Sequence, residues 1–184
     1  KSLRSFGMMQ SPKKDMAGVI SFYPSERPDL VRQLSRLPSY SKDELRSNYH
    51  RVDWTQYEVI SVYENNGIVQ GFSVAWHRSK YYKKGEIRIL SRYWKNSSIR
   101  LTNTHTELAM PHLIDMIQHQ LAMCKELGFT EAFISREKSP RYFRKLITSI
   151  QEKTNIQWHL YDDKQCVCMP KSSSCWQYKA STKL

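Results

Sequence analysis

Long apolar runs and glycine are both scarce in this sequence of 184 residues, which contains six glycines. No apolar stretch approaches the roughly 20 residues that a membrane-spanning helix needs, so we expect no membrane segment. The first residues, KSLRSFGMMQS, include basic side chains but lack the apolar core of a secretory signal, and we expect a cytoplasmic protein. Hydrophobic residues (40%) and aromatic residues (12%) are too frequent for a disordered chain and indicate a folded domain.

Cysteine is also sparse, with Cys124, Cys166, Cys168 and Cys175. The last three lie close together, which raises the question of a metal site. The single residue between the cysteines of CVC is shorter than the two to four residues of the usual zinc knuckle. A strand with alternating faces explains this spacing more simply, so we predict no metal site. With no sign of export, reduced thiols are expected.

Acidic residues are few: 17, against 29 lysines and arginines, which gives a net charge of +12 and favours anionic partners. Between residues 78 and 100 a single acid, Glu86, accompanies eight basic residues, a local excess of eight minus one, or +7. These basic residues are Arg78, Lys80, Lys83, Lys84, Arg88, Arg92, Lys95 and Arg100. They suit a phosphate-bearing ligand or nucleic acid, but an ordinary solvated surface is also consistent with them. The scarcity of acids argues against a polycationic substrate.

Hydrophobic periodicity and turn residues predict a mixture of strands and helices. The clearest signal is a pair of β-rich runs around Asn65, Asn66 and Gly67, typical of a β-hairpin. The predicted elements are a strand at 16–23, helices at 26–38 and 41–52, the hairpin at 57–76, a strand at 85–94, a helix at 111–127, a strand at 130–135, a helix at 139–154 and a closing hairpin at 156–169 turning at 162–164.

This order contains one strand–helix–strand crossover in a mostly antiparallel sheet, so it predicts an α+β (mixed α/β) fold. We expect a single domain over residues 1–184, with peripheral tails at 1–15 and 170–184. The junction between the strand at 85–94 and the next helix, ILSRYWKNSSIRLTNTHTELAMPHLIDM, is rich in arginine and lysine. Junctions of this kind often bind phosphate through glycine-rich loops, yet this one contains no glycine.

Several segments resemble the GCN5-related N-acetyltransferase (GNAT) superfamily. They include EIRILSRYW, LIDMIQHQLAMCKELGF, TEAFISRE and SPRYFRKLI, and with the hairpins the resemblance covers about residues 16–169. Within the family, SRYW and CWQ are similar to acetyltransferase-like proteins of marine bacteriophages. The resemblance implies a central sheet in which one parallel strand pair splays apart to hold acetyl-CoA. It also implies direct transfer of acetyl to an amine of a small molecule or a protein.

The resemblance further implies the positions of the cofactor site. Backbone groups of the earlier parallel strand would hold the pantetheine arm, and the following loop and helix start would hold the pyrophosphate. The corresponding residues are Ile89, Leu90, Ser91, Arg92, Arg100, Thr102, Asn103, Thr104 and Ser139. The family's loop pattern, Arg/Gln-x-x-Gly-x-Gly/Ala, is missing here. Either residues 102–106 form a polar loop that replaces it, or acetyl-CoA binding has been lost.

Acetyl transfer requires a base for the amine and an acid for the leaving thiol. The resemblance implies Glu86 as the base and Tyr142 as the acid. A surface charge and core packing are the respective alternatives. Two other functions remain open. One is nucleic-acid binding through aromatic residues that alternate with the basic ones: Trp76, Tyr81, Tyr82, Tyr93 and Trp94. The other is a host-interaction protein on a degenerate fold without catalysis.

Overall fold

A seven-stranded sheet forms the body of the computed structural model, which describes residues 17–37, 52–94, 103–136, 140–161, 167–168, 175–176 and 178–184. The elements are β1 (Ala17–Phe22), α1 (Pro28–Ser35), the 3-10 helix η2 (Trp54–Gln56), β2 (Val59–Asn65), β3 (Ile68–Trp76), β4 (Glu86–Trp94), α2 (Asn103–Glu126), β5 (Glu131–Arg136), α3 (Pro140–Thr154), β6 (His159–Leu160), β7 (Val167–Cys168), β8 (Cys175–Trp176) and β9 (Tyr178–Lys183). The helix predicted at 41–52 falls outside the described residues except for its last position.

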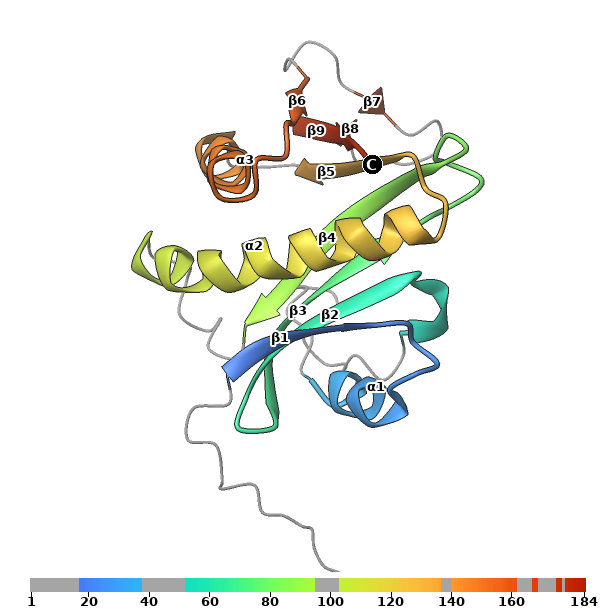
Figure 1. Ribbon diagram of the computed structural model, residues 1–184, viewed down its shortest axis with the longest axis vertical. Coiled ribbons are helices and arrows are strands. Elements are labelled where there is room, and N and C mark those ends of the chain that lie inside the picture. Colours follow the sequence, from blue (N-terminus) through green and yellow to red (C-terminus); the bar gives the residue numbers. More distant parts are fainter. Residues whose placement is uncertain are drawn as a thin grey trace, which may run out of the picture.

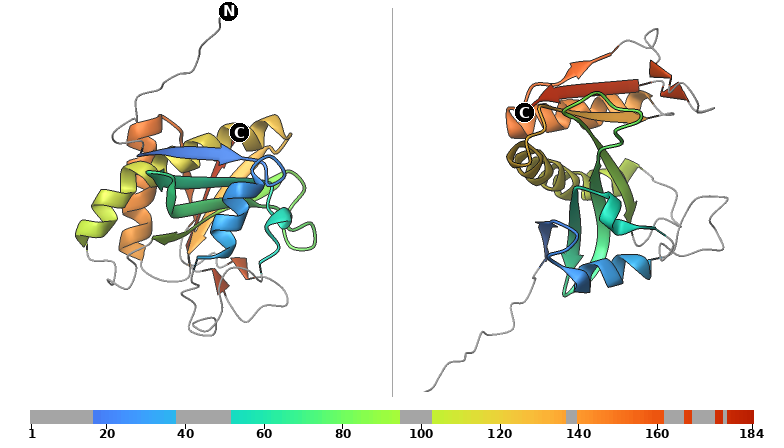
Figure 2. Two further views of the ribbon diagram at one scale, coloured as in Figure 1. Left: turned by 90° about the horizontal axis from the view of Figure 1, so that it is seen from below. Right: turned by 90° about the vertical axis from the view of Figure 1, so that its right-hand side faces the viewer.

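The strand order in the sheet is β1-β2-β3-β4-β5-β9-β6. Every neighbouring pair in this described sheet is antiparallel except β4 and β5, which are parallel and joined through α2 (Figure 1). The β2–β3 turn uses Asn66 and Gly67, both with positive φ (51° and 76°), as a two-residue hairpin turn requires. The α+β fold, the hairpin and the crossover are therefore confirmed. The right-hand view of Figure 2 shows the strong twist of this sheet, with β5 and β9 running across the direction of β2 and β3.

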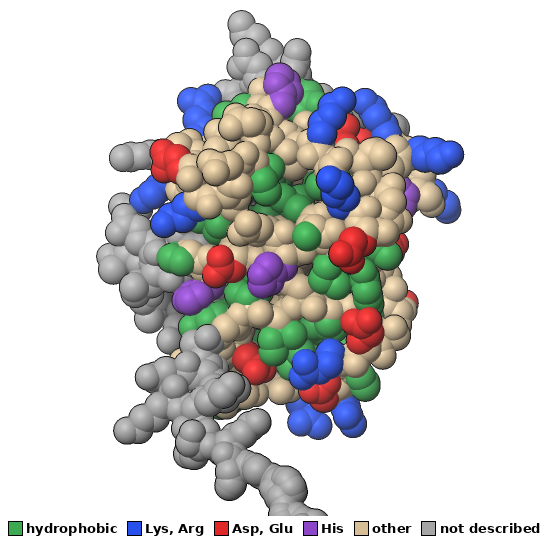
Figure 3. All heavy atoms as spheres, viewed as in Figure 1, with side chains coloured by type: hydrophobic (Ala, Val, Ile, Leu, Met, Phe, Trp, Pro, Cys, Tyr) green, Lys and Arg blue, Asp and Glu red, His purple; other side chains and the backbone are tan. Residues whose placement is uncertain are grey.

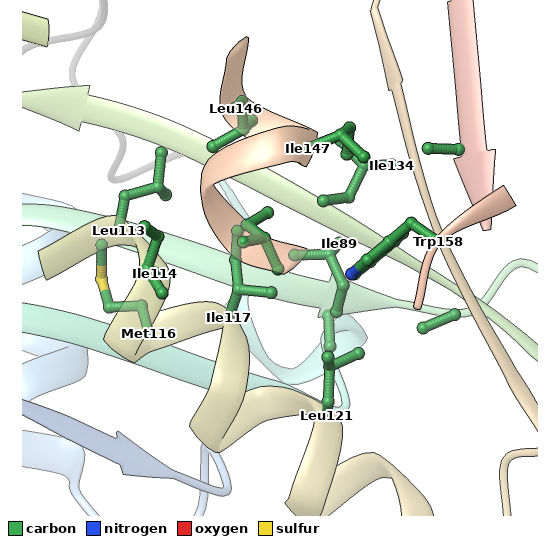
Figure 4. Close-up of a cluster of buried hydrophobic side chains, with 14 of the residues drawn as sticks. Ile89, Leu113, Ile114, Met116, Ile117, Leu121, Ile134, Leu146, Ile147 and Trp158 are labelled. Atoms are coloured by element: carbon green, nitrogen blue, oxygen red, sulfur yellow. The ribbon is translucent and has the colours of Figure 1, made fainter. Parts of the chain in front are cut away.

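Strand alternation separates two hydrophobic cores, one on each face of the sheet. On one face α2 and α3 cover a cluster that includes Ile87, Ile89, Ile117, Ile134 and Ile147 (Figure 4). On the other face α1 covers a second cluster over β1, β2 and β3. No helix in the described part of the chain is long and apolar enough to cross a membrane.

The start of α2 differs from the prediction. The recurrence of apolar residues at three- and four-residue steps predicted a helix from Pro111 to Leu127. In the structure α2 begins at Asn103, and Pro111 lies inside it. An internal proline removes one backbone hydrogen bond and typically costs about 3 kcal/mol, which the burial of Leu113, Ile114 and Ile117 offsets. The polar loop predicted at 102–106 is therefore wrong from residue 103 onward, because these residues form the first turn of α2.

The closing hairpin and the C-terminal tail also differ from the prediction. Strand β6 does not pair with β7, the described part of the second strand of the predicted hairpin. It pairs with β9, which lies between β5 and β6, while β7 pairs with β8. Residues 178–183 are thus part of the main sheet and not a peripheral tail. The sequence of β9 looked polar because Lys179, Ser181 and Thr182 are buried polar residues.

Candidate functional site

The parallel strands β4 and β5 separate after a short stretch of pairing. Only three residue pairs join them, Glu86 with Glu131, Ile87 with Ala132 and Arg88 with Phe133. Beyond this point β4 continues to Trp94 beside β3, and β5 continues to Arg136 beside β9. Beyond Arg88 and Phe133 no described residues of the two strands pair with each other, so an extended ligand could pair with their facing backbone groups. We call this opening the split.

One face of the split is closed by the hydrophobic core. Ile89 and Ile134, the first residue on each strand beyond the last pair, are 1% and 4% exposed and point toward α2 and α3. Ile117, Leu121 and Trp158 pack around them (Figure 4). A group lying in the split would therefore have an apolar wall on this face, and the alternate side chains of the two strands form the opposite face.

A buried ion pair lies on that opposite face, at the closed end of the split. The ammonium of Lys179 on β9 donates to Oε1 of Glu86 on β4 at 3.2 Å, and the two side chains are 10% and 8% exposed. The same ammonium lies 4.6 Å from the centre of the Phe133 ring and 5.3 Å from that of Tyr161. Because β5 lies between β4 and β9, the side chain of Lys179 reaches across β5 over Phe133, the last residue of β5 that pairs with β4. No other described side chain bonds to the Glu86 carboxylate.

Two further side chains, His77 and Tyr82, pack at the closed end of the split. Nδ1 of His77 lies 2.7 Å from the backbone carbonyl oxygen of Glu86. A carbonyl only accepts, so Nδ1 carries the proton. The ring of Tyr82 packs edge-on against Phe133, with centroids 5.1 Å apart. Burial raises the pKa of the Tyr82 hydroxyl, and the positive charge of Arg88 partly opposes this. Tyr82 therefore stays protonated at neutral pH.

The predicted site residues fall at two ends of the split. Glu86 lies at the closed end. Ile89, Leu90, Ser91 and Arg92 follow on β4, along the open part. Asn103 and Thr104 form the start of α2, which follows β4, and Tyr142 lies in the first turn of α3, which follows β5. Both strands run toward the open end of the split. Arg100, Thr102 and Ser139 lie outside the described residues.

The basic residues of segment 78–100 do not form one patch. Arg78, Lys80, Lys83 and Lys84 precede β4 and lie at the closed end, whereas Arg92 lies near the other end of the strand. The six residue steps of β4 from Glu86 to Arg92 separate the two groups by roughly 20 Å at 3.3 Å per residue. Only the second group lies near the start of α2, so one phosphate site cannot account for both.

Sequence reasoning missed Lys179, because its partner lies 93 residues earlier and β9 was taken as part of a tail. It treated Tyr82 only as a surface aromatic, although this residue is 7% exposed. Cys124 is buried on α2, and burial raises the pKa of its thiol to about 12, which agrees with a packing role. Among the described residues there is no group of His, Cys, Asp and Glu arranged to hold a metal ion.

The sheet with one parallel pair that opens into a split is the arrangement that the resemblance implied. No protein-family model matches the sequence, and no curated protein matches it. The structure is similar to a GNAT-family acetyltransferase from Streptococcus pneumoniae, with a TM-score of 0.49, 8% identity, and coverage of 91% of this chain and 99% of that one.

Two further solved structures are similar and carry ligands. One is YncA from Salmonella typhimurium with its cofactor acetyl-CoA, with a TM-score of 0.48, 9% identity, and coverage of 91% of this chain and 93% of that one. The other is a Bacillus subtilis acetyltransferase in complex with CoA, with a TM-score of 0.44, 14% identity, and coverage of 91% of this chain and 99% of that one.

Proposed function

We propose that the protein is an acyl-CoA-dependent N-acetyltransferase, which transfers acetyl from acetyl-CoA directly to an amine. The observation that carries the proposal is the split: β4 and β5 pair over three residues and then part, with one face closed by Ile89 and Ile134. An extended pantetheine arm can pair with the backbone of β4 as an added strand would. The apolar wall suits its methyl and methylene groups.

The residues that are present fit the pyrophosphate without a glycine loop. A helix start offers unpaired backbone N–H groups and the positive end of the helix dipole, whatever its side chains. In this chain α2 begins at Asn103, so Asn103, Thr104 and the following residues supply these donors. Arg92, near the end of β4, and Arg100 add positive charge for the phosphates. Ser139 stays a proposed contact at the start of α3.

In the proposed reaction Glu86 accepts the proton that the attacking amine loses. Lys179 holds one carboxylate oxygen at 3.2 Å, and the side chain is only 8% exposed. Proton transfer to Glu86 therefore uses the oxygen that Lys179 does not bind, directly or through one water molecule. Tyr142 gives a proton to the sulfur that leaves as the thioester carbon–sulfur bond breaks. The new bond joins the amine nitrogen to the acetyl carbon.

The acceptor is an amine of a small molecule or of a protein. The alternative from the sequence, a binding protein without catalysis on the same fold, predicts that acetyl-CoA does not bind. One measurement separates the two functions, because a ligand that binds only the folded state stabilises it. At 100 times the dissociation constant the gain is about 2.7 kcal/mol, or a rise in the melting temperature of roughly 5–11 °C for a chain of this size.

Acetyl-CoA is therefore titrated in a thermal-shift assay and by calorimetry, with adenosine as the control ligand that lacks the pantetheine arm and phosphates. We expect a saturable shift with acetyl-CoA and none with adenosine. Release of the CoA thiol is then followed in the presence of primary amines, both small amines and peptides with free N-termini. No stabilisation by acetyl-CoA at millimolar concentration contradicts the enzyme and supports the alternative.

A further inference from the structure

We propose that the loop between β3 and β4, residues 77–85, is a docking surface for single-stranded nucleic acid, separate from the site proposed for the phosphates of the acetyl donor. The loop carries Arg78, Lys80, Lys83 and Lys84 and contains no acidic residue. The three lysines are exposed. Glu86, which follows the loop, is buried and paired with Lys179, so its charge is already matched. In Figure 3 lysine and arginine side chains gather at the upper right, where Figure 1 places this loop.

The charges sit on an ordered loop. Backbone N–H groups of Tyr81 and Tyr82 donate to the carbonyl of Arg78 at 2.8 and 2.9 Å. The guanidinium carbon of Arg78 lies 4.6 Å from the centre of the Trp76 ring and 4.5 Å from that of Tyr81. Arg78 is thus held between two aromatic rings by cation–π contacts, and these contacts also fix the orientation of Tyr81.

The other end of the loop is anchored to the start of β5. Gly85 has a positive φ of 79°, and its carbonyl accepts from the N–H groups of Thr130 and Glu131 at 2.9 and 3.2 Å. A Cβ atom at Gly85 would lie 2.5 Å from Oγ1 of Thr130. Tyr82 inserts into the body against Phe133. Since the loop is fixed at both ends, a ligand would order little backbone on binding, and this lowers the entropic cost.

The location of the loop excludes the phosphates of the acetyl donor as its ligand. These phosphates are assigned to the start of α2, beyond the far end of β4. The loop lies before the near end, and the nine residues of the strand put roughly 26 Å between them. An anionic partner of the loop would therefore be a different molecule.

The aromatic ring beside the lysines favours a nucleic-acid strand. Tyr81 is 38% exposed, and the contact with Arg78 supports one face of its ring. An exposed base can stack on such a ring while neighbouring phosphates contact the lysines, which is how sequence-independent proteins hold single strands. In a duplex the bases are already stacked and do not reach the ring. An acidic peptide would satisfy the lysines but leave the ring without a partner.

The test uses fluorescently labelled oligo(dT) and oligo(U) and the full chain. The loop variant carries Lys80→Ala, Lys83→Ala and Lys84→Ala. The matched control carries Arg32→Ala, Arg144→Ala and Lys153→Ala, which remove the same charge from exposed positions on α1 and α3. Binding is measured by anisotropy over a series of salt concentrations. Poly-glutamate serves as the acidic-peptide probe. A DNA duplex of the same length as the oligonucleotides serves as the double-stranded probe.

We expect wild type and the control to bind the single strands with a steep salt dependence. The loop variant should lose three phosphate contacts, which lowers the slope of log K against log salt by about 2. Tyr81→Ser should weaken binding about tenfold or more, because it removes one stacking contact. Oligo(dT) and oligo(U) separate DNA from RNA as the source. Acetyl-CoA should stabilise the loop variant as much as wild type. Stabilisation by acetyl-CoA therefore tests the proposed acetyl transfer separately from oligonucleotide binding, which tests the loop.

Three results overturn the inference. One is the absence of single-strand binding at low salt by wild type. Another is equal weakening in the loop variant and the control, which makes the effect one of net charge alone. The last is binding of poly-glutamate in preference to both oligonucleotides, with Tyr81→Ser unchanged, which assigns the loop to an acidic protein partner.

Discussion

Replacing Lys179 with methionine tests the ion pair at the closed end of the split. The substitution keeps most of the length of the side chain but leaves the Glu86 carboxylate, 8% exposed, without its counter-ion. Breaking a buried pair by removing one partner typically costs about 3–5 kcal/mol. The cation–π contacts with Phe133 and Tyr161 are lost as well. For a chain of this size we expect the melting temperature to fall by roughly 6–20 °C.

The double variant Glu86→Met with Lys179→Met separates the charges from the packing. With both charges gone no buried ion remains unpaired, and such replacements are often neutral. We therefore expect most of the stability to return, which calorimetry and urea unfolding can measure. Lys183→Met is the matched control, because Lys183 lies on the same strand but is exposed. Its melting temperature should stay within about 1 °C of wild type.

The same double variant tests the role of Glu86 in the reaction. If Glu86 is the general base, kcat for acetyl transfer should fall by about 100-fold or more, while the affinity for acetyl-CoA stays unchanged. Two outcomes would refute the reasoning. Lys179→Met with the stability of wild type would show that the pair is not desolvated. A folded double variant with full kcat would show that the pair only joins β4 to β9.

Three further predictions concern other parts of the molecule. Thr104→Glu puts a negative charge in the first turn of α2, so it should weaken acetyl-CoA binding about tenfold without loss of stability. Thr148→Glu on α3 should leave both the binding of acetyl-CoA and the stability unchanged. If calorimetry finds the same affinity for both variants, the pyrophosphate does not bind at the start of α2. Gly85→Ala should cost more stability than Gly67→Ala, because both have positive φ (79° and 76°) but only the Cβ at Gly85 meets another atom, Oγ1 of Thr130 at 2.5 Å; equal urea midpoints would contradict the close approach. Cys124, with its pKa raised to about 12, should resist alkylation by iodoacetamide at pH 8.5 in the native state and react after unfolding, which mass spectrometry of the tryptic peptides can follow; rapid native labelling would show that α2 opens easily.

The sequence predicts the part of the fold in which the signals are local. Alternating apolar residues identify β2, β3 and β4, and Asn66 with Gly67 fixes the hairpin turn that joins the first two. The crossover from β4 through α2 to β5 follows from helical periodicity. These signals place Glu86 and residues 89–92 on one strand, so the framework of the candidate site was accessible before the structure.

The C-terminal half of the sheet depends on contacts that the sequence does not display. Strand β9 contains the buried residues Lys179, Ser181 and Thr182, which a hydrophobicity pattern assigns to the surface. A distant group meets each of them: Lys179 binds Glu86, Oγ of Ser181 donates to the hydroxyl of Tyr161 at 3.4 Å, and Oγ1 of Thr182 donates to the carbonyl of Gln157 at 2.6 Å. Tertiary pairing therefore outweighed the local hydrophobicity pattern. Because β9 could not be predicted as a strand of the sheet, the ion pair between Lys179 and Glu86 could not be predicted either.

The missing glycines in the junction after β4 acquire a different meaning once α2 is seen to start at Asn103. A glycine-rich loop is useful because it lets backbone N–H groups approach a phosphate closely. A helix that begins eight positions before Pro111 already presents such groups at its first turn, with the helix dipole behind them. The absence of glycine therefore removes one way of binding the anion and leaves the other. Whether α2 uses it is what Thr104→Glu measures, since that change adds a charge at the donors and leaves the helix itself as stable as before.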